Sequence, residues 1–158
     1  MKPIPGTRIN LFAIFSALLI LWLCTGCSTF HRDWKQAAGL PVTPGDLLGR
    51  WEGTWVSEDN GHQGRLRCLV TKTGADRYQA RFHANYRKIL SFGYTVPLRV
   101  QVLPSGMDYR FRGEANLGWY AGGLYRYEGS ATPSTFNATY RSSSDYGTFR
   151  MSRPVPAP

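Results

Sequence analysis

Residues 78–86 alternate apolar and polar side chains without interruption, in the order Tyr-Gln-Ala-Arg-Phe-His-Ala-Asn-Tyr. Successive side chains of a β-strand point to opposite faces, so this pattern puts Tyr78, Phe82 and Tyr86 on one face and the polar side chains on the other. A surface helix would instead repeat its apolar residues every three or four positions. The segment therefore predicts a strand with one buried face and one solvated face.

The same alternation recurs through most of the chain, and Gly, Pro, Asn and Asp clusters of the kind found in turns separate its repeats. After residue 40 no segment shows a helical period of useful length. Pro97, in the middle of one alternating segment, indicates a sheet edge or a break. The predicted strands are 49–57, 64–72, 77–87, 89–103, 107–117, 123–131, 135–142 and 146–153.

Each predicted strand has one apolar face, and the sheet must hide that face from water. Short connections between neighbouring strands favour antiparallel, up-and-down order. Closing the sheet on itself hides the apolar faces and removes the exposed edges that invite aggregation. The expected fold is therefore all-β, a small antiparallel up-and-down β-barrel of about eight strands, with a two-sheet β-sandwich as the alternative.

The N-terminal segment is of a different kind. Residues 1–8 contain Lys2 and Arg8 and no acidic residue, and the 15 residues 9–23 are almost entirely apolar. A basic start, a short apolar run and small residues at its end are typical of a secretory signal peptide. The run is shorter than the roughly 20 residues of a membrane-spanning helix, which makes a permanent anchor helix the weaker interpretation.

The end of this run, Leu-Cys-Thr-Gly-Cys-Ser at residues 23–28, resembles the lipobox of bacterial lipoproteins. The resemblance implies that Cys27 receives a diacylglycerol on its sulfur and that the signal is cut just before it. Several acyl chains would then anchor the chain to membrane. Ser28, in place of an Asp, favours the outer membrane over the inner one in a cell with two membranes. An ordinary signal peptide and an uncleaved anchor are the alternatives.

This reading divides the chain into four parts: a signal peptide at 1–26, a lipidated N-terminus and linker at 27–47, the barrel domain at 48–153, and a disordered Pro-rich tail at 154–158. In the mature chain Cys68 is the only cysteine other than Cys27, so no intramolecular disulfide is expected. Cys68 lies at an apolar position of a predicted strand and is expected to be a small buried side chain.

The chain is strongly basic, with a net charge of +9, and removing Lys2 and Arg8 leaves +7 for the mature part. Most of the basic residues are arginine, whose planar guanidinium binds phosphate in a bidentate manner. An exported protein does not meet nucleic acid, so no nucleic-acid partner is expected. Anionic lipid headgroups and envelope glycans are the expected polyanions, and a merely solvated basic surface is the alternative.

Gly49-Arg50-Trp51 opens the first predicted strand and resembles the Gly-x-Trp signature of the calycin superfamily, which includes lipocalins, fatty-acid-binding proteins and avidins. In that group the Trp closes the floor of the barrel, and an Arg from near the last strand packs over it. The resemblance implies this role for Trp51, with Arg150 or Arg153 as the packing arginine. It supports the architecture and does not indicate a ligand.

An eight-stranded barrel is either filled by its own side chains or holds one small ligand. Inward positions in this chain mix aromatic residues with Ala and Gly, which fits a filled, tapering interior or a small aromatic pocket. The candidate ligand-binding residues are Tyr78, Phe82 and Tyr109 inside the barrel. Trp119 and Tyr120, in a Gly-rich turn, are candidates to cover the barrel mouth or to meet a partner or membrane.

Catalysis is not expected. His31, His62 and His83 lie in unrelated local contexts that match no metal-binding motif, and no nucleophile elbow is present. No cofactor, metal or catalytic residue is therefore assigned. Two functions remain: a membrane-anchored barrel that binds a small apolar or amphipathic ligand, or a non-catalytic interaction protein whose Arg-rich face contacts envelope polyanions or a partner protein.

Overall fold

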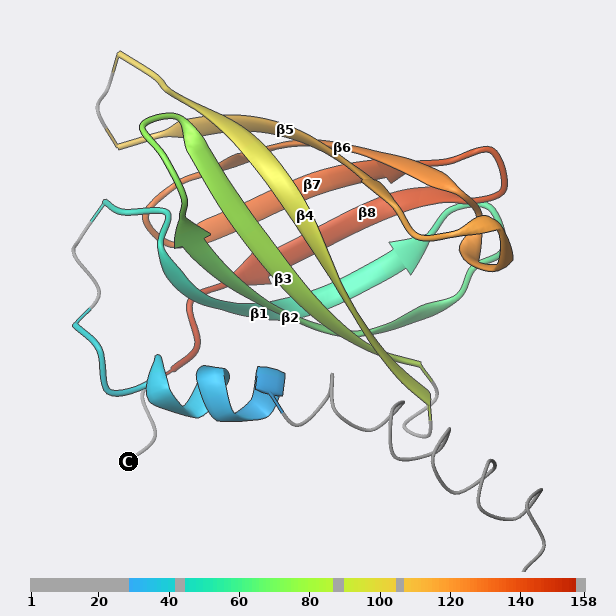
Figure 1. Ribbon diagram of the computed structural model, residues 1–158, viewed down its shortest axis with the longest axis horizontal. Coiled ribbons are helices and arrows are strands. Elements are labelled where there is room, and N and C mark those ends of the chain that lie inside the picture. Colours follow the sequence, from blue (N-terminus) through green and yellow to red (C-terminus); the bar gives the residue numbers. More distant parts are fainter. Residues whose placement is uncertain (1–28, 42–44, 87–89, 105–106, 156–158) are drawn as a thin grey trace, which may run out of the picture.

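Eight antiparallel strands and one short helix make up the folded part of the chain (Figure 1). The computed structural model describes residues 29–41, 45–86, 90–104 and 107–155, so Cys27 and residues 156–158 lie outside the described residues. The strands are β1 (Gly49–Ser57), β2 (Gln63–Lys72), β3 (Arg77–Tyr86), β4 (Leu90–Val102), β5 (Tyr109–Asn116), β6 (Leu124–Ala131), β7 (Thr135–Arg141) and β8 (Tyr146–Ser152). A single 3-10 turn, η1 (Trp119–Ala121), connects β5 to β6.

The strands form a closed barrel in which each strand pairs with its neighbours in sequence and β1 pairs with β8. Trp55 of β1 lies opposite Phe149 of β8 in the ladder that completes the closure. The alternation predicted for β3 is confirmed, because Tyr78 and Phe82 are buried and face the barrel axis while Gln79 is exposed. The all-β, up-and-down barrel is thus the observed fold, and the sandwich alternative is not.

Pro97 lies within β4, at the point where one of the barrel ladders ends. Residues Leu90–Val102 pair with β3 along most of their length, but among the described residues the ladder with β5 begins only at Leu98. Proline has no N–H to donate to a ladder, so it is tolerated where one side of the strand is unpaired. The edge that the sequence indicated at Pro97 is therefore a local one inside a closed barrel.

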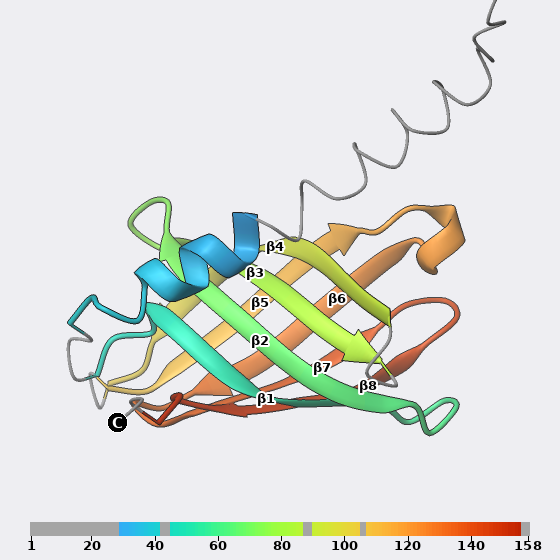
Figure 2. The same cartoon turned by 90° about the horizontal axis from the view of Figure 1, so that it is seen from below.

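The two ends of the barrel differ. The floor end, where β1 begins, is crossed by residues 45–48, whose Leu47 carbonyl accepts a 2.9 Å hydrogen bond from the indole of Trp51. Tyr109 donates a 2.5 Å hydrogen bond from its hydroxyl to the Gly45 carbonyl. The opposite end carries the turn between β5 and β6 and is named the η1 end (Figure 2). The interior is therefore sealed at the floor by the chain itself.

A helix at residues 29–36 lies on the outside of the barrel over β2 and β3 (Figure 2). Phe30 and Trp34 form a small second core with Leu69 of β2. Asp33 accepts a 2.6 Å hydrogen bond from Arg81 of β3. Residues 29–36, which fall in the linker predicted from the sequence, thus form a helix packed against the barrel wall. None of the helices in the described part of the chain has the length and apolar character that crossing a membrane requires.

Candidate functional site

Aromatic rings in mutual contact fill the barrel interior from one end to the other. Near the floor, Phe111 stacks on Phe136 with 4.5 Å between ring centroids. Further along the axis, Phe149 lies 5.4 Å from Phe82 and 5.0 Å from Tyr140, again between ring centroids. Interiors packed in this way have few voids that would admit a ligand. The packing favours the filled interior over the aromatic pocket.

The polar groups inside the barrel are also satisfied by one another. Among the described residues, every buried side-chain nitrogen or oxygen has a hydrogen-bond partner. Burial raises the pKa of Tyr94 and of Tyr127 well above the ordinary tyrosine range, so both hydroxyls stay protonated. A binding pocket usually presents a few polar groups that await a ligand. The interior has the character of a structural core.

Arg153 is the arginine that packs over Trp51. Its guanidinium carbon lies 3.7 Å from the centroid of the Trp51 ring. Its Nη1 donates a 2.6 Å hydrogen bond to the Leu48 carbonyl, and its Nη2 donates to the Asp46 carbonyl. Arg150, the other candidate from the sequence, is exposed on the outer face of β8. The contact that the calycin resemblance implied is therefore made by Arg153.

The five side chains expected to bind a ligand are not brought together. Tyr78, Phe82 and Tyr109 are buried inside the barrel, Phe82 in its middle and the two tyrosines toward the floor end. Trp119 and Tyr120 lie in η1 with 91% and 79% of their surface exposed. They do not close over the barrel mouth. These residues therefore belong to two separate environments.

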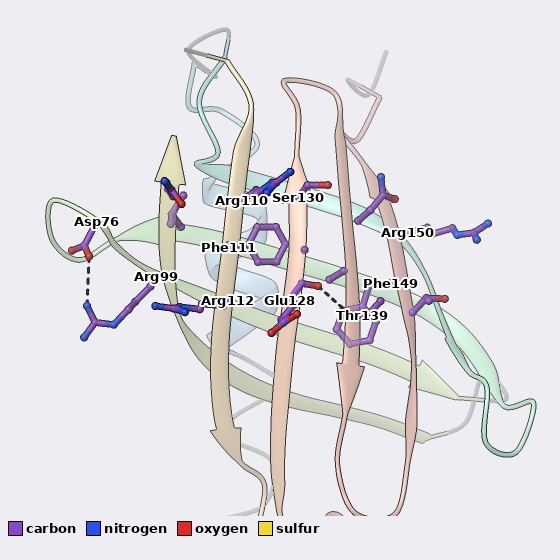
Figure 3. A pocket seen from close by; sticks show the side chains of 16 residues that line it. Asp76, Arg99, Arg110, Phe111, Arg112, Glu128, Ser130, Thr139, Phe149 and Arg150 are labelled. Atoms are coloured by element: carbon purple, nitrogen blue, oxygen red, sulfur yellow. Dashed lines mark hydrogen bonds and ion pairs between the residues drawn. The ribbon is translucent and has the colours of Figure 1, made fainter. Parts of the chain in front are cut away.

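A broad depression lies on the outside of the barrel wall, over β4 to β8 (Figure 3). We call it the arginine groove. Figure 3 shows its polar side chains on neighbouring strands, with the buried rings of Phe111 and Phe149 behind them. The charged residues that line it are Asp76, Arg99, Arg110, Arg112, Glu128 and Arg150, which leaves a net charge of +2.

Strand register sets two rows of side chains across this groove. In one row Arg99 of β4 lies directly opposite Arg112 of β5, which in turn lies opposite Glu128 of β6. In the other row Arg110 and Arg150 stand on β5 and β8, separated by polar residues of β6 and β7. Like charges placed directly opposite on paired strands destabilise a sheet. The Arg99–Arg112 pair is therefore unfavourable by itself, and Glu128 opposite Arg112 and Asp76 beside Arg99 offset part of the repulsion.

Few of the groove charges are neutralised within the protein. Asp76 forms an ion pair with Arg99, with 3.5 Å between Oδ2 and Nη1. No described residue forms an ion pair within 4.0 Å of Arg110, Arg112 or Arg150. Exposed ion pairs contribute at most about 1 kcal/mol each, so Asp76 only weakly restrains Arg99. The groove presents guanidinium groups that are free to bind an anion from solution.

Other reactive groups do not form a site. Cys68 is fully buried, and desolvation raises the pKa of its thiol well above the usual value. The described residues contain no group of three or more His, Cys, Asp or Glu side chains placed to hold a metal ion. His31 and His83 approach each other with 5.1 Å between ring centroids, but they do so in the packed contact between the helix and the barrel.

Comparison with protein-family models, with curated proteins and with solved structures found no match for this chain. The function must therefore be argued from the geometry itself. The sequence showed arginines on the polar faces of the strands without singling out these four. Up-and-down strand order makes β4 and β5 neighbours, but the register that places Arg99 against Arg112 depends on the length of the turn between them.

Proposed function

We propose that this chain is a lipid-anchored protein of the bacterial envelope whose barrel is a non-catalytic module for binding polyanions. The anchor would be the acylated Cys27, as the resemblance of residues 23–28 to a lipobox implies. The outer membrane is the favoured destination because Ser28 follows the cysteine. Exported proteins meet polyanions as phosphorylated glycans, polyphosphates and lipid headgroups, and the chain is basic enough to attract them.

The single observation that carries the binding proposal is the Arg99–Arg112 pair on the β4–β5 side of the arginine groove. Two guanidinium groups held opposite each other repel, and an anion between them converts that repulsion into attraction. Arginine binds phosphate through two parallel N–H donors, which is stronger than a single neutral hydrogen bond. Arg110 lies two residues from Arg112 on the same face of β5, so a chain of phosphates would meet several arginines at once.

The filled interior argues against the small apolar ligand as the main function. Phe82, Tyr94 and Phe149 occupy the middle of the barrel, and the floor is closed by Trp51 and Arg153. The groove, in contrast, is open to solvent, and its Arg110, Arg112 and Arg150 form no ion pair with any described residue. The geometry therefore favours the interaction protein over the apolar-ligand carrier.

The test compares binding of inorganic polyphosphate to the full chain, purified in uncharged detergent, with binding by the double variant Arg99→Gln/Arg112→Gln. Each charge-assisted contact contributes about 1.5 kcal/mol or more, so the double variant is expected to lose at least about tenfold in affinity. The matched control is Arg32→Gln/Arg65→Gln, which removes the same charge outside the groove. It should lose no more than about threefold, because exposed charges far from the site are screened.

Equal losses of affinity in the two double variants would refute the arginine groove as the binding site. Binding would then reflect only the net charge of the chain. A parallel titration with anionic phospholipid vesicles separates lipid headgroups from soluble polyanions as the source of phosphate. The anchor is tested independently by intact-mass measurement of the chain isolated from membranes. A mass that includes residues 1–26 and lacks acyl chains would overturn the assignment of Cys27.

A further inference from the structure

Exposed apolar side chains gather at the η1 end of the barrel, away from the floor. Three strands that begin at this end, β4, β6 and β8, each present a large exposed side chain at or near their first residue. The turn η1, which contains Trp119 and Tyr120, lies beyond the ends of the strands it connects (Figure 1). We call this set the aromatic rim, and its members are Leu90, Phe92, Trp119, Tyr120, Leu124 and Tyr146.

The tip of the rim is an ordered turn. Gly118 and Gly122 adopt positive φ angles of 87° and 91°, which residues with a Cβ rarely accept. A Cβ on Gly118 would lie 2.7 Å from the ring of Tyr120, so the glycine also makes room for that ring. Asn116 accepts a 2.9 Å hydrogen bond from the Gly118 N–H through its side chain. The turn is thus built to hold Trp119 and Tyr120 outward.

Trp119 and Tyr120 have little protein to cover them. Their rings meet edge to face with 6.2 Å between centroids, and 91% of Trp119 remains exposed. Moving apolar surface out of water is favourable, and these two side chains gain little of that free energy while they are exposed. Trp and Tyr are the residues enriched at membrane–water interfaces, because an apolar ring and a polar N–H or O–H suit that boundary. The composition of the tip fits this environment.

The start of the helix faces the same end of the molecule. Thr29 and Phe30 share a depression with Phe92 and its neighbours at the beginning of β4. The helix runs from that side toward the floor end, as Figures 1 and 2 both show. Cys27 precedes Thr29 by two residues, which span at most about 7 Å of extended chain. Thr29, the first described residue, thus lies on the side of the aromatic rim, and Cys27 is only two residues before it in the sequence.

Charge at this end is mixed, because Glu58 and Asp145 lie beside the rim residue Tyr146 together with Arg141. Arg141 places its guanidinium carbon 5.1 Å from the ring centroid of Tyr146, beside the rim. Arg126 stands directly opposite Arg141 on the neighbouring strand, and Glu114 neutralises only Arg126, with 3.0 Å between Oε1 and Nε. The basic residues can contact anionic headgroups, but the acidic residues offset them, so the apolar surface of the rim is what favours the bilayer.

We propose that the aromatic rim seats on the surface of the anchoring bilayer, with Trp119 and Tyr120 inserted at the headgroup level. This orientation rests on the proposed acylation of Cys27. It has a consequence for the arginine groove, whose Arg99, Arg112 and Arg150 lie toward the floor end of their strands. The groove, on the side wall of the barrel, is then open to the aqueous space beside the bilayer and to the polyanions in it.

The test uses the acylated full chain in phosphatidylglycerol and phosphatidylethanolamine vesicles, with and without bromine on the acyl chains close to the headgroups. Bromine quenches tryptophan only at short range. After residue 26 the chain has four tryptophans, and Trp34, Trp51 and Trp55 are buried. Brominated lipid is expected to quench the wild-type emission, and the Trp119→Phe variant should lose that quenching. Leu40→Phe, an exposed position far from the rim, is the matched control and should keep it.

Equal emission in brominated and plain vesicles would overturn the seating of the rim, as would quenching that persists in Trp119→Phe. If quenching is absent and position 119 crosslinks to another protein in the intact envelope, the rim binds a protein. That outcome would refute binding to the bilayer. The mass of the Cys27 peptide is read on the same sample. Missing acyl chains would refute the anchor, whereas acylation without quenching would refute only the seating.

Discussion

Arg153 and Trp51 form a stacked pair that joins the end of the last strand to the beginning of the first. The guanidinium carbon lies 3.7 Å from the indole centroid, and the guanidinium nitrogens donate to backbone carbonyls of residues 46–50. Burial lowers the pKa of Arg153, but arginine remains charged at any physiological pH. The pair therefore holds a charged group against the core, where it fixes the segment that crosses the floor.

Replacing Arg153 should destabilise the barrel more than its position near the chain end suggests. Arg153→Lys keeps the charge but loses the planar fork that bonds several carbonyls and stacks on Trp51. We expect the free energy of unfolding to fall by about 2 kcal/mol, measured by denaturant titration. Arg150→Lys, on the exposed outer face of the same strand, should change it by less than about 0.5 kcal/mol. Similar losses in both variants would contradict the role of the stacked pair.

The packing of the helix on the barrel should weaken in acid. His83 is buried under the helix, stacked on Phe30 with 5.1 Å between ring centroids. Desolvation lowers its pKa, and the charges of His31 and Arg67 lower it further, while Asn85 acts in the opposite direction. Arg81 and Asp33 also lie at this contact, as an ion pair. The folded state therefore binds fewer protons at His83 than the unfolded state does.

The sign of this linkage fixes the pH range. Because the pKa of His83 is lower in the folded state, neutral His83 stabilises that state fully above the unfolded pKa of about 6.5. This stabilisation is lost as the pH falls through the pKa of the folded state. Amide exchange in residues 29–36 should therefore accelerate between pH 7 and pH 5, after correction for intrinsic exchange. His83→Phe keeps a stacking ring and removes the titration, so its exchange should be less dependent on pH. An unchanged dependence in that variant would place the effect elsewhere.

Cys68 should be inert while the barrel is folded. Its thiol is fully buried, and desolvation raises its pKa, so the reactive thiolate is scarce at neutral pH. We expect no reaction with a thiol reagent at pH 8 in the native protein, and one reactive thiol per acylated chain after unfolding in denaturant. Rapid reaction of the native chain would show that β2 opens easily. A second reactive thiol after unfolding would mean that Cys27 is not acylated, provided that the mass of the chain shows residues 1–26, which include Cys24, to be absent.

The strands were predictable because their physics is local. Alternation in residues 78–86 places Tyr78 and Phe82 on one face whatever the rest of the chain does, and the predicted boundaries fall within two residues of the observed ones. Closure also followed, because every predicted strand had an apolar face to hide. The sequence could not decide whether Arg153 or Arg150 packs over Trp51, because that depends on which side chain reaches the floor once the barrel has closed.

The alternation of apolar and polar residues could not predict the surroundings of His83, for a different reason. Alternation correctly places His83 on the outer face of β3, where a solvated side chain is expected. It is buried nevertheless, because a helix about fifty residues earlier in the chain packs over it. Long-range packing of this kind leaves no periodic signal in either segment. The arginine groove was not predicted for a similar reason, because the register between strands sets its two rows of side chains across β4 to β8.

The filled interior makes a final prediction that distinguishes a structural core from a ligand pocket. Phe149 contacts Phe82, Tyr127 and Tyr140 in the middle of the barrel. Phe149→Ala should cost about 3–5 kcal/mol and leave an apolar cavity, which stays dry and accepts a small aromatic molecule. Benzene should therefore raise the Tm of Phe149→Ala and leave that of the wild type unchanged. Phe149→Leu is the milder variant if the alanine chain fails to fold, and a wild type stabilised as strongly by benzene would show that the cavity already exists.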